Sequence, residues 1–227
     1  MARLIAKEYS SSGSATSGLT SYALEGQHTP RKYRLKAKSA VAKAVPTDAA
    51  AHAAATSHLN VKPAPTDAQI EAGNYPKGHV RIAGLDVSIE NPTGSQRRPE
   101  WPPLTSHYGY IRKTTGADGD HVDAFVRNGT PTDFNGPVFV IDQYVNGAFD
   151  EHKVMLGWYD EDSARRAYLS NYTPGWDGLH AIHALTLDEF KQWLSNGSTD
   201  KEYSAPSGRN GARLKAAPPT TNNSTEV

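Results

Sequence analysis

Residues 108–126, YGYIRKTTGADGDHVDAFV, decide how this chain folds. Apolar and aromatic side chains dominate Tyr108–Ile111 and Val122–Val126, which have the length of short strands, and the segment between them is polar. That segment and the start of the second strand carry three carboxylates within six residues, at Asp118, Asp120 and Asp123. The stretch therefore predicts two strands joined by a loop that presents an acidic cluster.

Similar short segments, separated by turn signals, lie on both sides of this stretch. The further strands expected are His79–Ile82, Leu85–Ile89, Val138–Tyr144 and Lys153–Trp158. Residues 66–72 open with Thr66 and Asp67 and predict one short amphipathic turn, whereas residues 91–103 hold too much proline and glycine for regular structure. Strands of this length and spacing predict a small β-barrel, closed or nearly closed.

Two helices are expected after the strands. Residues 160–172 begin with acidic side chains, which suit a helix N-terminus, and end before Pro174. Residues 186–197 begin with the capping-box pattern of Thr186 and Glu189, carry apolar side chains at helical spacing, and end at a glycine. The fold class predicted is α+β, with two C-terminal helices that pack on the sheet.

Composition divides the chain into three parts. Residues 1–63 are rich in serine, alanine and lysine and predict a disordered or extended basic arm, residues 64–197 hold the domain, and residues 198–227 form a flexible tail. Within the arm, residues 36–57 could form alanine-rich helical turns, but Pro46 interrupts them and leaves any helix marginal. Only the middle part has enough apolar side chains for a core.

Charge is distributed unevenly between these parts. Residues 66–197 hold 11 Lys and Arg against 18 Asp and Glu, whereas residues 1–65 hold 9 against 3. An acidic domain suits a site that collects cations, and the basic segment 31–43 suits an anionic partner such as nucleic acid or a capsid surface. A solvated tether is the alternative for that segment.

Some classes are excluded by what the sequence lacks. Cysteine is absent, which rules out disulfides, thiolate metal sites and a cysteine nucleophile within this chain. No apolar run approaches the length of a membrane span, and residues 1–14 lack the apolar core of a signal peptide. We therefore expect a protein that is neither secreted nor embedded in a membrane.

The acidic loop is the feature that carries chemistry. Three carboxylates this close repel one another unless a cation lies among them, and a hard divalent ion is suited to that place. The spacing does not fit a calcium-binding EF-hand, because Val122 occupies a position that needs an oxygen ligand. An ordinary solvated acidic turn is the alternative.

The run from Tyr108 to Asp123 resembles the signature of family I soluble inorganic pyrophosphatases. In that family Tyr-Gly-Tyr/Phe-Ile is followed at this distance by Asp-Gly-Asp-Pro-hydrophobic-Asp, and residues 89–92, IENP, resemble its Glu-Ile-Pro motif. Residues 72–97, together with VIDQ at 140–143 and FDEHKVMLGW at 149–158, are also similar to a pyrophosphatase-like domain of multidomain proteins from bacteriophages and conjugative elements. The resemblance covers about residues 65–195 and implies a small pyrophosphatase-like, OB-like β-barrel.

The resemblance also implies roles for particular residues. Two or more Mg²⁺ ions, or Mn²⁺ instead, would be held by the three loop aspartates, with Glu90 as a ligand or an acid behind them and Glu151 as a further ligand for which Asp150 competes. Phosphate would be bound by Lys153, by Arg97 or Arg98, and by the hydroxyls of Tyr108 and Tyr172. Core packing is the alternative role for Tyr172. The catalytic set implied is Asp118, Asp120, Asp123 and Glu90.

Several departures from the family pattern bear on activity. His121 replaces the proline after the second aspartate, either as a surface side chain in the turn or as a further metal ligand. The turn at Asn146 replaces an acid, and Thr173 stands where a second lysine would follow. These changes leave both the rate and the substrate open.

The function implied is Mg²⁺-dependent hydrolysis of pyrophosphate, or of a nucleotide-linked pyrophosphate, by a phage-encoded protein. The alternative is a virion-associated module that keeps the fold with little or no catalysis and attaches through residues 31–43. The expected location is the cytoplasm of a bacterial host or the virion, and a homo-oligomer is left open.

Overall fold

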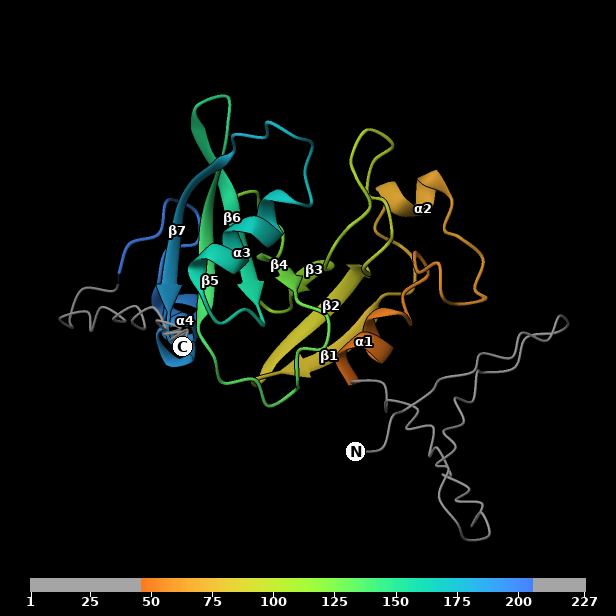
Figure 1. Cartoon of the computed structure of the whole chain (residues 1–227), viewed down its shortest axis with the longest axis horizontal. Coiled ribbons are helices and arrows are strands. Elements are labelled where there is room, and N and C mark those ends of the chain that lie inside the picture. The colour runs from red at the N-terminus through yellow and green to blue at the C-terminus, as the bar shows by residue number, and fades with distance from the viewer. Residues whose placement is uncertain (1–45, 206–227) are drawn as a thin grey trace, which may run out of the picture. The chain divides into compact units, whose positions relative to one another are not determined.

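Seven strands form one sheet in the order β1-β2-β3-β4-β6-β5-β7 in the computed structural model, which describes residues 46–205 (Figure 1). The strands are β1 (Gly78–Ile82), β2 (Leu85–Asn91), β3 (His107–Ile111), β4 (Asp123–Val126), β5 (Val138–Val145), β6 (Ala148–Leu156) and β7 (Leu179–Leu185). The helices are α1 (Pro46–Ala51), α2 (Asp67–Glu71), α3 (Glu161–Leu169) and α4 (Leu187–Asn196). The basic segment 31–43 lies outside the described residues.

The sheet is open rather than closed. β1 pairs with β2 and β7 pairs with β5, so these two strands are the edges of the sheet. All pairs are antiparallel except β4 with β6, which is parallel. The predicted α+β class and sheet-dominated, OB-like architecture are confirmed, but the barrel is not closed.

The centre of the sheet is buried on both faces, because a helix packs on each side. On β5, Val138 and Val140 point into the core cluster that contains Trp193 of α4. Phe139 and Ile141 point into a second cluster that contains Tyr168 of α3. Strands buried on both faces read as continuous apolar runs, which explains the composition of β5.

None of the helices in residues 46–205 is long and apolar enough to cross a membrane.

Both predicted C-terminal helices are present, and their N-termini are capped as the sequence indicates. Asp160 accepts a hydrogen bond from the Ser163 N–H at 2.7 Å, and Thr186 forms a capping box with Glu189. The first helix ends at Leu169, three residues before the predicted end. Between the helices lies β7, which the sequence analysis did not predict because only Leu185 in it is fully buried.

The helix α1 lies before residue 64, where the domain was expected to begin. Pro46 is its first residue, a position at which proline loses no hydrogen bond, so this proline starts the helix instead of interrupting it. Ala51 is fully buried in the core cluster of β1 and β2, and Ala54 is fully buried just beyond the helix. Residues 46–63 thus contribute to the packed unit, although the sequence analysis placed them in the arm.

A buried acid, Asp142 of β5, joins three elements at the face of α4. Its Oδ2 lies 2.9 Å from His183 Nε2, and its Oδ1 lies 3.0 Å from His152 Nδ1, an ion-pair distance without hydrogen-bond alignment. The Tyr203 N–H donates to Oδ1 at 3.1 Å. Burial alone would raise the pKa of Asp142, but the contacts from the two histidines and the Tyr203 N–H hold it far below its ordinary value.

Asp142→Asn should therefore lower the free energy of unfolding at neutral pH by on the order of 2 kcal/mol. A depressed pKa in the folded state contributes stability that is fully present above the unfolded pKa of about 4 and is lost progressively as the pH falls from there through the folded pKa. Denaturant unfolding at pH 7 and pH 3 should show the gap between wild type and variant shrinking in acid. A constant gap would contradict this role, and Asp177→Asn, an exposed acid, is the control.

Candidate active site

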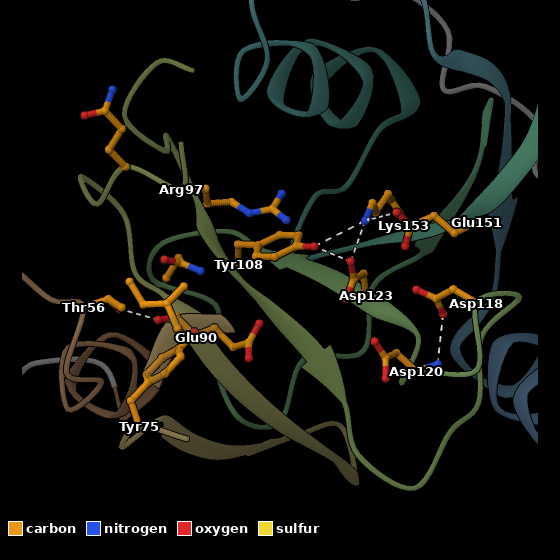
Figure 2. A pocket seen from close by; sticks show the side chains of 13 residues that line it. Thr56, Tyr75, Glu90, Arg97, Tyr108, Asp118, Asp120, Asp123, Glu151 and Lys153 are labelled. Atoms are coloured by element: carbon orange, nitrogen blue, oxygen red, sulfur yellow. Dashed lines mark hydrogen bonds and ion pairs between the residues drawn. The ribbon is translucent and has the colours of Figure 1, made fainter. Parts of the chain in front are cut away.

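A cavity of about 430 Å³ collects most of the residues that the sequence analysis singled out (Figure 2). Five carboxylates line it, from β2, the β3–β4 loop, β4 and β6: Glu90, Asp118, Asp120, Asp123 and Glu151. Arg97, Tyr108 and Lys153 line the same cavity. Eight predicted residues, distant in sequence, therefore share one space.

The parallel pairing of β4 with β6 brings the first basic residue to the acids. Asp123 and Lys153 are partners in this register. Phe125 and Met155, two residues further along the same strands, lie in the core cluster that contains Tyr168 of α3. Lys153 Nζ lies 2.5 Å from Asp123 Oδ2 and 2.6 Å from Glu151 Oε1, and its side chain is 3% exposed. A buried lysine needs such partners, since an unpaired buried charge is strongly unfavourable.

Proton occupancy in this group follows from burial and charge. Burial would lower the pKa of Lys153, but Tyr108, Asp123 and Glu151 together raise it well above its ordinary value. Burial raises the pKa of Tyr108 well above its usual range, so its hydroxyl keeps its proton and donates to Asp123. Burial also raises the pKa of Glu151, an effect that Asp123 increases and Lys153 opposes. The lysine remains a cation at neutral pH.

Glu90 reaches the cavity because β2 is irregular there. Ile89 pairs with Gly109 and Asn91 pairs with Tyr108, so Glu90 is the extra residue of a bulge. A bulge redirects the side chain of its extra residue. Figure 2 shows the Glu90 carboxylate pointing into the space that Asp120 and Asp123 face from the other side.

Arg97 lies across the aromatic ring that borders the cavity. Its guanidinium carbon is 3.5 Å from the centroid of Tyr108 and 5.1 Å from that of Trp101. Stacking of this kind holds a guanidinium in place while its N–H groups remain available for an anion. Arg97 has no ion pair with any acid in residues 46–205.

The acidic loop turns at Gly119, whose φ of 88° is unfavourable for other residues. Asp118 Oδ1 accepts a hydrogen bond from the Asp120 N–H at 3.0 Å, and both side chains are exposed. His121 stacks on Tyr110 with centroids 4.9 Å apart, and its Nδ1 lies 2.6 Å from the Thr114 carbonyl oxygen. These contacts give His121 a structural place in the turn.

Three predicted residues do not line the cavity. Arg98 is exposed, with its guanidinium 4.9 Å from the Trp101 ring. Asp150 is exposed on β6 and accepts a hydrogen bond from Gln143. Tyr172 is buried, stacks on Trp176, and donates its hydroxyl to Gln143 Oε1 at 3.1 Å. Core packing accounts for Tyr172 because its hydroxyl already has a buried partner.

Sequence reasoning missed the wall that precedes β1. Thr56, Ile70 and Tyr75 line the cavity, and the Thr56 hydroxyl donates to the Glu90 carbonyl oxygen. Asn91 and Gln96, on either side of Pro92, also line it. The segment 72–97 belongs to the sequence resemblance, which was the available signal, but the motif assigns no role to Tyr75.

Comparison with models of protein families shows to which family the chain belongs. The model of the family described as Inorganic Pyrophosphatase matches residues 67–195, more than half of the chain. The chain belongs to the inorganic pyrophosphatase family. Comparison with curated proteins gave no match. At the level of the family, membership supports a hydrolase with pyrophosphate as substrate.

Members of the inorganic pyrophosphatase family generally use Mg²⁺, and the donor set of this cavity suits such an ion. Carboxylate oxygens are the ligands that hard divalent cations prefer, and five carboxylates face one space here. No three His, Asp or Glu side chains of residues 46–205 are arranged to hold one ion. Asp123 is instead paired with Lys153. The acids therefore match the ion in donor type and in lining one cavity, but they are not arranged around a single ion.

Proposed function

We propose that this chain hydrolyses inorganic pyrophosphate with Mg²⁺ as cofactor. A water oxygen forms a bond to one phosphorus atom, the bond from that phosphorus to the bridging oxygen breaks, and two phosphates result. The observation that carries the proposal is the single cavity, in a member of the inorganic pyrophosphatase family, that holds five carboxylates beside Lys153 and Arg97. The carboxylates would hold the ions, which when bound supply charge neutralisation and a more acidic water.

The basic residues would bind and orient the anion. Lys153 presents its ammonium between Asp123 and Tyr108, at the boundary of the cavity. Arg97 presents a planar guanidinium with several N–H donors, which match two phosphate oxygens at once. The Tyr108 hydroxyl, which keeps its proton, can donate to a phosphate oxygen as it now donates to Asp123.

Asp120 would accept the proton of the attacking water. Its carboxylate lines the cavity, is exposed, and has no ion pair with any residue in the range 46–205. A general base must be free to take a proton, and Asp123 is less suited because Lys153 and Tyr108 already contact its Oδ2. Asp120 is therefore the acid we assign to this step.

A pyrophosphate that carries a nucleoside is the second substrate we propose. Cavities of about 300–1,000 Å³ hold drug-sized ligands, and this one of about 430 Å³ falls in that range. Ile70 and Tyr75 add apolar surface that a bare polyanion does not need. Comparing pyrophosphate with nucleoside triphosphates as substrates distinguishes the two.

The test is release of inorganic phosphate from pyrophosphate by the purified full chain. Release should require Mg²⁺, or Mn²⁺ in its place, and should stop when a chelator removes the ion. Absence of release at every concentration of either ion, in a folded protein, would contradict the proposal. It would favour a module that keeps the fold without turnover, attached in a virion through residues 31–43 of a phage-encoded protein.

A further inference from the structure

A second cavity, of about 370 Å³, adjoins the first across the same acids. Glu90, Asp120 and Asp123 line both cavities. Lys153 and Arg97 line only the first, whereas Lys77, from the segment before β1, lines only the second. The shared carboxylates thus have basic side chains on both sides.

Lys77 is held at this place by several contacts. Its Nζ lies 3.2 Å from Glu90 Oε1 and donates to the Gly73 carbonyl oxygen at 2.7 Å. It also lies 4.6 Å from the centroid of the Tyr75 ring, and its side chain is only 12% exposed. Lysine is rarely this buried without a defined anionic partner. The position of Lys77 is therefore fixed with respect to Glu90.

Competition for Glu90 determines what this lysine can do. Glu90 is one of the three carboxylates that line both cavities, and a divalent cation bound beside them would share the charge of Glu90 with Lys77. Lys77 then sits partly buried beside the cavity with a weakened ion pair. A phosphate oxygen is an anionic acceptor of the kind that a lysine ammonium binds as a point charge.

We propose that Lys77 binds a phosphoryl group of the substrate on the side of the shared carboxylates opposite Lys153. The inference rests on the proposed function, because it requires the anion to lie at the acidic wall. Pyrophosphate would then extend across Glu90, Asp120 and Asp123, with Lys153 and Arg97 at one phosphoryl group and Lys77 at the other. This role comes from a segment to which the Tyr-Gly-Tyr and Asp-Gly-Asp motifs assign nothing.

Calorimetric titration with imidodiphosphate, a pyrophosphate analogue with a P–N–P bridge, tests the proposal without turnover. With Mg²⁺ present, Lys77→Met should raise the dissociation constant about 10- to 100-fold, the range expected for loss of one charge-assisted hydrogen bond. Lys77→Arg should restore most of the affinity. Lys113→Met is the matched control, since Lys113 also pairs with an acid, Asp86, but is 79% exposed and lines neither cavity.

The outcomes separate this inference from the proposed function. Equal affinity of wild type and Lys77→Met would overturn the role of Lys77 and leave the proposed function standing, whereas failure of the wild type to bind would contradict both. If Lys77→Met does not fold, acetylation of wild-type lysines followed by mass spectrometry replaces it. Imidodiphosphate with Mg²⁺ should protect Lys77 and leave Lys113 reactive, and equal reactivity of Lys77 with and without the analogue would overturn the inference.

Discussion

Asp120→Asn should lower the turnover of pyrophosphate about 100- to 10,000-fold, the range for loss of a general base. The amide has the shape of the carboxylate but neither its charge nor its basicity. The Asp120 side chain has no ion pair within residues 46–205 and is exposed, so the free energy of unfolding should change by less than about 0.5 kcal/mol. Steady-state phosphate release and denaturant unfolding of the same preparation measure both quantities.

Asp133→Asn is the control for this substitution. Asp133 is also an exposed aspartate in a turn, but it lines neither cavity, so its replacement should leave turnover unchanged. Full turnover in Asp120→Asn would exclude Asp120 from the reaction. A loss of stability together with activity would instead assign Asp120 a structural role in the loop.

The need for a compensating cation differs among the three loop aspartates because their charge partners differ. Three neighbouring carboxylates repel one another, and their spacing in sequence predicts a divalent cation among them. Lys153 already compensates the charge of Asp123, at 2.5 Å, so repulsion does not by itself require an ion there. Asp118 and Asp120 have no such partner in the part of the chain that the structure describes, and the demand for a cation is concentrated at these two.

The motif residues could be placed from sequence because each lies in or next to a strand with a clear pattern. The Asp-Gly-Asp loop follows β3 and precedes β4 in the expected order. A strand was predicted to begin at Lys153, and this residue lies within β6. Their convergence required knowing that β4 and β6 are parallel neighbours. That pairing cannot be read from either strand alone. The family resemblance implied the shared roles of these residues but not the strand pairing that brings them together.

Other parts of the site have no local signal. Lys77 and Tyr75 lie in a segment without regular structure, and their approach to Glu90 depends on how the chain enters β1. Helix α1 is short and half of its residues are alanine, so its sequence suggests a marginal helix. Its stability comes instead from packing of Ala51 against the sheet, which propensity does not report.

Gly109→Ala should lower the free energy of unfolding by about 3 kcal/mol or more, at or above the upper end for overpacked sites. A Cβ at this position would lie 1.9 Å from the Ser88 carbonyl oxygen and 2.8 Å from the Ile89 Cα, both of which are backbone atoms of β2. Backbone cannot rotate away as a side chain can, so β3 would have to separate from β2. Denaturant unfolding measures the loss.

The same substitution should also impair the site, because Gly109 is opposite the bulge that presents Glu90. Separation of the strands would move Glu90 away from Asp120 and Asp123, and binding of imidodiphosphate with Mg²⁺ should weaken along with stability. Gly116→Ala is the stability control, since its nearest neighbour would lie at an ordinary 3.4 Å and its φ is not positive. If Gly109→Ala were as stable as wild type, close approach of β2 and β3 could not be the reason for a glycine between Tyr108 and Tyr110.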